Sequence, residues 1–203
     1  MTARLPAVDA TAADIVATVL HSPPTLGSGR LVCVDGYAGS GKTTLAAALT
    51  RSFRDAQRAL RVRTLHMDSV YDGWAGLDAG METVASSVVG PLREGRPGCY
   101  RRYDWHRSAF AEERAVPPCD VLLVEGVGAG GRADGYVDAV TCLVWVATPS
   151  DVRLDRGLRR DGDDQHAQWL AWQQQEDRMF ARERTRERAD IVVDGTSGRL
   201  LPR

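Results

Sequence analysis

Lysine is nearly absent from this chain: Lys42 is the only one, and arginine supplies every other strongly basic side chain. Neither sign of charge is in excess, because the formal net charge is −1 at pH 7 and the pI is about 6.4. A chain with this balance has no general basic field, so nucleic acid is not expected as a partner. Any site that attracts anions must therefore be local.

Cysteine is also scarce. The four cysteines, Cys33, Cys99, Cys119 and Cys142, lie far apart, and no two form a C-x-x-C pair. This spacing indicates neither a zinc site nor a disulfide framework. No apolar run approaches the length of a membrane span, and the chain does not start with a basic segment followed by an apolar signal stretch. We therefore expect a cytoplasmic protein without a membrane partner.

The length and the pattern of apolar runs predict one α/β domain. A chain of 203 residues with 43% hydrophobic content can bury one substantial core. Continuous apolar runs are typical of parallel strands covered on both faces, and here they alternate with segments of helical periodicity. We expect residues 1–203 to form a single three-layer domain with a central parallel sheet and helices on both faces. The expected strands are 31–35, 61–67, 121–125, 141–147 and 191–193, and the expected helices are 15–20, 45–53, 81–92 and two helices within 151–189 that are separated at Gly162.

The most specific motif is a glycine-rich loop between an apolar strand and a helix. Residues 36–43 match the pattern G-x-x-x-x-G-K-[ST] in full. In such a loop the backbone N–H groups converge on phosphate oxygens, the lysine reaches the β- and γ-phosphates, and the hydroxyl after it can bind Mg²⁺. The motif predicts a P-loop NTPase fold that uses ATP and Mg²⁺. The expected nucleotide-binding residues are Gly36, Gly39, Ser40, Gly41, Lys42, Thr43 and Thr44, with Lys42 also catalytic and Thr43 also a metal ligand.

Two acidic residues follow apolar strands, and in a parallel α/β fold such strand ends lie near the phosphate loop. Asp68 begins the segment Asp68-Ser69-Val70-Tyr71, where its carboxylate could accept the proton of an acceptor hydroxyl while Tyr71 holds the acceptor. The alternative is that Asp68 caps the following turn. Glu125 could bind magnesium or orient its water, and the alternative is a capping or turn residue. Together with the loop, the two acids predict phosphoryl transfer to a hydroxyl.

Three arginines, Arg153, Arg156 and Arg160, occur at i, i+3 and i+7 on an expected helix. Guanidinium groups suit phosphate oxygens, so we expect residues 151–189 to form a helical, arginine-rich lid that closes on ATP. In this lid Arg153 would contact the nucleotide, and Arg156 and Arg160 would act in catalysis. The alternative for each arginine is a solvated surface position paired with a nearby aspartate.

With these motifs in this order, the chain resembles the uridine kinase family of P-loop kinases over about residues 31–195. The resemblance implies an ATP-dependent kinase in which Asp68 is the base for the ribose 5′-hydroxyl and Tyr71 lies beside the nucleoside. It also implies contacts to the base or the sugar for Tyr103, which stands in a Tyr-Asp pair, and magnesium for Glu125.

The acceptor side departs from the family pattern in two ways. Ser108 stands where the family usually places a histidine, five residues after Tyr103. The segment 72–80 is short and glycine-rich, and it contains Asp78, the expected sugar ligand. Among the histidines, only His106 has neighbours that suit a substrate contact, and the alternative is an ordinary surface histidine. The acceptor therefore stays open between a nucleoside and another small alcohol.

The oligomeric state is not fixed by the sequence. Two other functions also stay open: a regulatory ATPase that acts on protein partners, and a nucleoside monophosphate kinase. A GTPase-type switch is excluded because its guanine-reading [N/T]-K-x-D element needs a second lysine. A nucleoside monophosphate kinase would need arginines on an acceptor phosphate, for which the sequence offers Arg93, Arg96, Arg101, Arg102 and Arg107.

Overall fold

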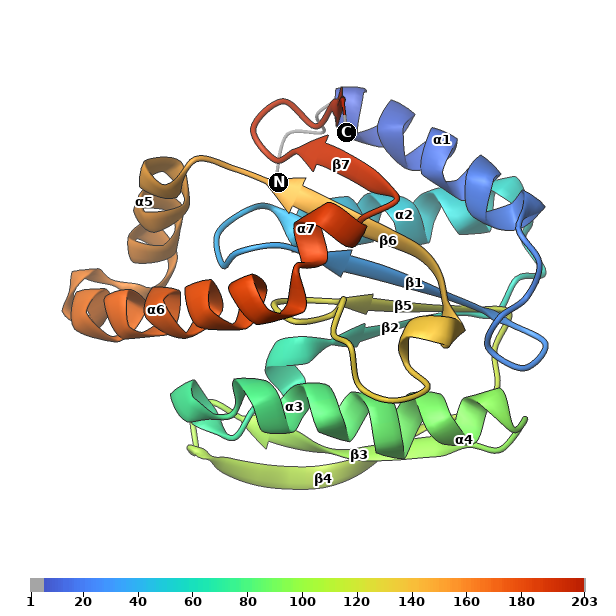
Figure 1. The fold of residues 1–203 in the computed structure, drawn as a ribbon, viewed down its shortest axis with the longest axis horizontal. Helices are drawn as coiled ribbons and strands as arrows, with labels where there is room; N and C mark the ends of the chain where they lie inside the picture. The colour runs from blue at the N-terminus through green and yellow to red at the C-terminus, as the bar shows by residue number, and fades with distance from the viewer. Residues whose placement is uncertain (1–5, 203) are drawn as a thin grey trace.

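The computed structural model describes residues 6–202 as a central sheet between two layers of helices (Figure 1). The six strands follow the order β2-β5-β1-β6-β7-β8, and all neighbours are parallel except β7 and β8. This architecture confirms the expected three-layer α/β fold. The strands are β1 (Arg30–Asp35), β2 (Val62–His66), β5 (Val121–Glu125), β6 (Val140–Ala147), β7 (Ile191–Asp194) and β8 (Leu200–Leu201).

The register of the sheet brings three polar side chains to one edge. In β1 and β5, Val34 pairs with Glu125, and in β2 and β5, His66 pairs with Glu125. Asp35, the last residue of β1, pairs with Trp145 of β6. The carboxyl ends of these parallel strands are therefore level, which places their terminal side chains around one site.

One face of the sheet is covered by α1 (Pro6–His21) and α2 (Lys42–Ala56), which pack against each other. The sequence predicted only a short first helix at 15–20, whereas α1 has 16 residues. Its longer apolar stripe explains the difference: Val8, Ala12, Ile15 and Val19 are all buried at helical spacing against the core of this face.

The other face carries a helix that changes its winding. It starts as α3 (Leu77–Thr83), widens into the π-helical segment η3 (Val84–Val89) and ends as α4 (Gly90–Arg93). The expected helix at 81–92 is therefore longer and irregular. Pro91 accounts for the irregularity, because it has no N–H to donate and its ring conflicts with the carbonyl four residues earlier, a conflict that a wider turn relieves.

A hairpin outside this helix was not predicted from the sequence. Strands β3 (Gly98–Asp104) and β4 (Ala109–Val116) pair antiparallel as a separate two-stranded sheet along α3 and α4 (Figure 1). Most side chains of β4 are exposed, so neither strand has the continuous apolar run by which the other strands were recognised. The turn at 105–108 brings Trp105 toward the segment that follows β2.

The sequence predicted that Asp68 ends a strand, and this prediction is wrong. Strand β2 stops at His66, and Met67–Ser69 form the 3-10 turn η1, so Asp68 lies one turn beyond the strand. The expected loop up to Gly80 also contains a second 3-10 turn, η2 (Gly73–Ala75), and the start of α3.

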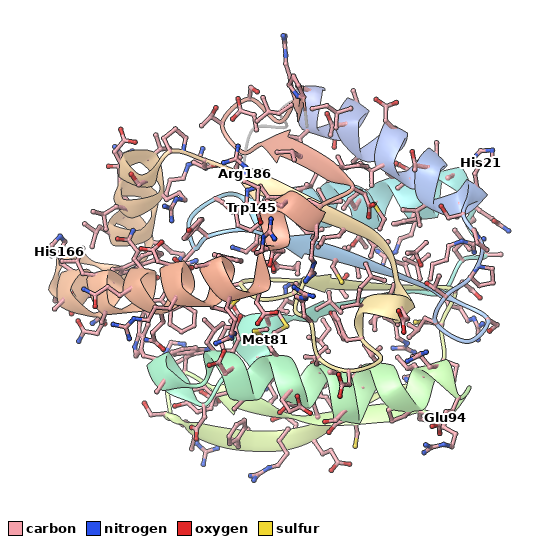
Figure 2. The ribbon with its side chains drawn as sticks, viewed as in Figure 1. His21, Met81, Glu94, Trp145, His166 and Arg186 are labelled. Carbon is pink, nitrogen blue, oxygen red and sulfur yellow. The ribbon has the colours of Figure 1, made fainter. Side chains whose placement is uncertain are left out.

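Two helices project beyond the carboxyl ends of the strands. They are α5 (Ser150–Asp161) and α6 (His166–Glu183), and Gly162 separates them with a positive φ of 98°, as predicted (Figure 1). Trp145 lies in the middle of the molecule, whereas His166 on α6 and Glu94 lie at its periphery (Figure 2). In the described residues no helix is both long and apolar enough to cross a membrane. The remaining short helices are η4 (Val137–Ala139), η5 (Asp163–Gln165) and α7 (Thr185–Arg188).

Candidate active site

The glycine-rich loop wraps over the start of α2 in the conformation that its sequence allows. Gly36, Gly39 and Gly41 have positive φ angles of 144°, 76° and 103°. At Gly39 a Cβ atom would also lie 2.4 Å from the carbonyl oxygen of Arg153, so that position has no room for a side chain. Gly41 directly precedes α2, whose first residue is Lys42. The backbone N–H groups at this helix start are available for an anion.

Lys42 is buried inside the loop. Its Nζ donates hydrogen bonds to the carbonyl oxygens of Gly36 and Tyr37, both at 2.8 Å. Burial lowers the pKa of Lys42, and the negative charge of Glu176 is the largest influence in the opposite direction, followed by Glu125. The ammonium group therefore lies near the acids Glu176 and Glu125. Within the described residues its hydrogen bonds go only to carbonyl oxygens, which phosphate oxygens could replace.

Asp35 clamps the phosphate loop to the loop after β5. The carboxylate is fully buried and accepts hydrogen bonds from the backbone N–H groups of Gly36 at 2.7 Å, Gly128 at 2.9 Å and Gly130 at 2.8 Å. Burial raises the pKa of Asp35 to about 6, against the lowering effect of these donors and of Lys42. Asp35 thus fixes the distance between the two loops that border the site.

Thr43 and Glu125 form an oxygen-rich pair at the start of α2. The Thr43 hydroxyl donates to the two carboxylate oxygens of Glu125 at 3.1 and 3.3 Å, and His66 Nδ1 lies 2.6 Å from Oε1. The hydrogen bond to Glu125 raises the pKa of His66. The described residues contain no group of three acidic, histidine or cysteine side chains that could hold a metal alone. One hydroxyl and one carboxylate fit Mg²⁺, which keeps waters and takes its other ligands from phosphates.

A cavity of about 620 Å³ unites most of the predicted site. Its lining includes residues of the phosphate loop and also Asp68. Burial, followed by the negative charge of Glu125, raises the pKa of Asp68, while His66 lowers it. The predicted site residues that line the cavity are Gly39, Gly41, Lys42, Thr43, Thr44, Asp68, Tyr71, Glu125, Arg156 and Arg160.

Tryptophan side chains, which the sequence did not assign to the site, line the cavity together with the predicted Tyr71. The ring of Trp74 lies 5.5 Å from that of Trp105 and 5.8 Å from that of Trp172, both edge to face. Tyr71 packs 5.5 Å from Trp172, and its hydroxyl donates to the Val127 carbonyl at 2.6 Å. Trp105 Nε1 donates to the backbone carbonyl of Asp68 at 2.9 Å, so the tip of the hairpin is attached to the turn that carries this acid.

The arginines of α5 take different positions. Arg153 is buried below the loop: its guanidinium carbon lies 4.1 Å from the centre of the Tyr37 ring, and its Nε donates to the Thr148 carbonyl. Arg156 reaches the carbonyl groups of Gly39 and Gly195. Arg160 is exposed and paired with Asp161. Only the last two border the cavity, whereas Arg153 supports the loop from behind.

Several predicted residues do not border the cavity. Gly36 and Ser40 lie within the phosphate loop itself, and Ser40 is buried. Tyr103 packs behind Trp105 at a ring distance of 5.2 Å. His106 is exposed in the hairpin turn, and Asp78 is exposed on α3 in an ion pair with Arg182. Neither of these two side chains is brought to the cavity.

The arginines that a monophosphate acceptor would need are also elsewhere. Arg93 donates to the Gly135 carbonyl, Arg96 pairs with Glu94, and Arg102 pairs with Glu112. None of the five arginines between residues 93 and 107 is among the described residues that line the cavity.

Comparison with known proteins gives a likeness in structure only. No family model matches the chain, and no curated protein matches it in sequence. The chain is similar to the structure of a possible uridine kinase from Bacillus stearothermophilus, with a TM-score of 0.64 and 20% identity over 91% of this chain and 98% of the other. It is also similar to a candidate fructose transport system kinase from Silicibacter sp. TM1040, with a TM-score of 0.61 and 22% identity over 88% of this chain and 94% of the other. At the level of fold, the resemblance to uridine kinases and related P-loop kinases is therefore confirmed.

Proposed function

We propose that the protein is an ATP-dependent kinase that transfers the γ-phosphoryl group to a hydroxyl of a small molecule, most closely a nucleoside. The observation that carries this proposal is one cavity that is lined both by the phosphate loop and by the carboxylate residue Asp68. Phosphoryl transfer needs these parts together: a cradle for the phosphates, a cation site, an oriented acceptor and positive charge over the transferring group.

The donor side is built from the loop and the start of α2. The loop N–H groups and Lys42 would hold the phosphates, with Lys42 exchanging two carbonyl partners for phosphate oxygens. Thr43 and Glu125 would hold Mg²⁺, which when bound neutralises charge on the phosphates. Arg156 and Arg160 approach from α5, where their charge would stabilise the transferring group.

The acceptor side is built around Asp68. Its carboxylate would accept the hydroxyl proton, and a pKa raised by burial brings it closer to the value that suits a base at neutral pH. The neighbouring rings of Trp74, Trp105 and Trp172 offer flat apolar walls. Such walls suit the planar base of a nucleoside better than a sugar alone, which supports a nucleoside acceptor.

A nucleoside monophosphate acceptor is less well supported, because the arginines that would hold its phosphate are engaged away from the cavity. Another small alcohol stays as the second candidate, since one of the similar structures is described as a fructose transport system kinase. The near-neutral charge of the chain supports a small-molecule partner in the cytoplasm, without nucleic acid or membrane.

The test is Asp68→Asn in the intact protein, with ATP, Mg²⁺ and a panel of uridine, cytidine, their monophosphates and simple sugars. We expect transfer to fall roughly 10²–10⁴-fold, as for loss of a positioned base, with binding of ATP retained. Asp72→Asn, an exposed aspartate in the same loop, is the matched control. Asparagine caps a turn almost as well as aspartate, so full activity of Asp68→Asn would assign Asp68 to capping and contradict the mechanism.

A further inference from the structure

Glu176 is a glutamate without any exposed surface in the middle of α6. One of its oxygens, Oε1, accepts two hydrogen bonds: from the backbone N–H of Ala38 at 2.6 Å and from Trp172 Nε1 at 2.9 Å. Ala38 belongs to the phosphate loop, and Trp172 belongs to the aromatic wall of the acceptor side. A single carboxylate oxygen thus contacts both halves of the cavity.

The surroundings of Glu176 are those of a charged group rather than of a packing residue. Lys42 faces it from the loop, and Arg153 faces it from α5 with Nη1 4.0 Å from Oε2. Tyr37 and Tyr71 are the other titratable groups near it. In the described structure Oε2 and Arg153 Nη1 are buried and have no hydrogen-bond partner, so the ion pair is loose. Burial raises the pKa of Glu176 to about 7, and Lys42 is the largest influence that lowers it.

We propose that Glu176 is a positioning residue that connects the aromatic wall of the acceptor side to the phosphate loop. Binding of phosphates in the loop would then change the hydrogen bond of Trp172. The connection has a short path: the loop N–H, one carboxylate oxygen and the indole N–H. A change at either donor alters the hydrogen bond that the same oxygen accepts from the other donor. That a bound nucleotide changes this connection rests on the proposed function. That one carboxylate oxygen accepts from both Ala38 and Trp172 does not.

The first experiment follows two N–H signals by ¹⁵N NMR in the free protein as the pH is raised through neutrality: the Ala38 amide and the Trp172 indole, which Trp172→Phe assigns. We expect one common midpoint for both signals, near pH 7, and loss of this shared titration in Glu176→Gln, where the titration of Asp35 near pH 6 remains at the phosphate loop. The glutamine keeps an oxygen that can accept both bonds and removes only the titration. Different midpoints in the wild type, or a common midpoint near pH 7 that persists in Glu176→Gln, would overturn the proposal.

The second experiment adds the ATP analogue AMP-PNP with Mg²⁺ and follows the same signals. In the wild-type protein the phosphates bring negative charge next to Lys42, so the common midpoint should rise. In Glu176→Ala the nucleotide-induced shift of the Trp172 signal should be largely lost, because the carboxylate that joins Ala38 to Trp172 is absent. An unchanged midpoint in the wild type, or a full shift in Glu176→Ala, would refute the connection.

The two experiments separate the connection from the enzyme assignment. Calorimetry measures AMP-PNP binding independently, so an absence of binding would contradict the kinase while the common midpoint in the free protein would still decide on the shared carboxylate. If Glu176→Ala does not fold, the wild type and Glu176→Gln carry the comparison alone. A merely structural role would leave the midpoint of the Trp172 signal unchanged when AMP-PNP binds to the wild type, so the rise of that midpoint distinguishes a positioning role.

Discussion

Replacing Glu176 by glutamine should stabilise the protein, and the gain should grow as the pH rises. The carboxyl is fully buried, and burial raises its pKa from 4.5 to about 7. An acid whose pKa is higher in the folded than in the unfolded chain costs stability once it ionises in the unfolded chain, so the wild type loses stability between about pH 4.5 and pH 7. Glutamine has the same shape and does not ionise. The variants should therefore be equally stable near pH 4.5 and differ above it.

The size of the effect follows from the two pKa values. The interval between 4.5 and about 7, at about 1.4 kcal/mol per pH unit, amounts to about 3 kcal/mol at pH 8. For a chain of this length such a difference raises Tm by about 6–12 °C. Because Oε1 of either side chain can accept the bonds from Ala38 and Trp172, the difference reports the charge alone.

The assay is urea unfolding of both proteins at pH 5 and pH 8, with fluorescence as the probe. Glu113→Gln, at an exposed position on β4, is the control for a glutamate that is not buried, and it should change stability equally at both pH values. A difference between wild type and Glu176→Gln that is the same at pH 5 and pH 8 would show that the charge of Glu176 does not titrate as the burial requires, and the reasoning would fail.

Three further substitutions test the site. Lys42→Ala should abolish transfer while circular dichroism shows an intact fold, because Lys42 holds only loop carbonyls; near-normal turnover would contradict its role. Asp35→Asn places an NH₂ group opposite a backbone N–H, which costs about 1–3 kcal/mol for the lost bond. The phosphate loop is then held less firmly, so calorimetry should show nucleotide affinity weaker by about tenfold; equal affinity would argue against the clamp. The double variant Arg156→Gln and Arg160→Gln should lower kcat more than it raises KM for ATP, and unchanged kcat would make both arginines surface charges.

The part of the site that could be predicted is the part with local sequence signals. The phosphate loop has a fixed spacing, and its glycines adopt the left-handed conformations that the motif requires. Glu125 follows a continuous apolar strand, and the sheet register places it beside His66. Asp35 follows the same rule at the end of β1, so the sequence carries a signal for this acid as well.

Glu176 and the hairpin are harder, because their roles depend on partners far away in the chain. Glu176 does leave a trace: it falls at helical spacing within the buried stripe of α6 that includes Trp169, Trp172 and Met179. An acid in such a stripe needs a partner, and the partner, Ala38, is 138 residues away. Trp105 reaches Asp68 only because β3 and β4 pair as a hairpin. The polar, arginine-containing sequence of these strands has no apolar pattern that predicts this pairing.

The near-absence of lysine makes Lys42 the only side-chain amine in the molecule. Burial lowers its pKa, so a larger share of it is the unprotonated, nucleophilic form than for an ordinary lysine. An acylating reagent or aldehyde that is small enough to enter the cavity therefore meets a single side-chain target, and whatever occupies the loop shields that target. The fraction of Lys42 that carries the label is then a direct measure of how much of the loop is filled.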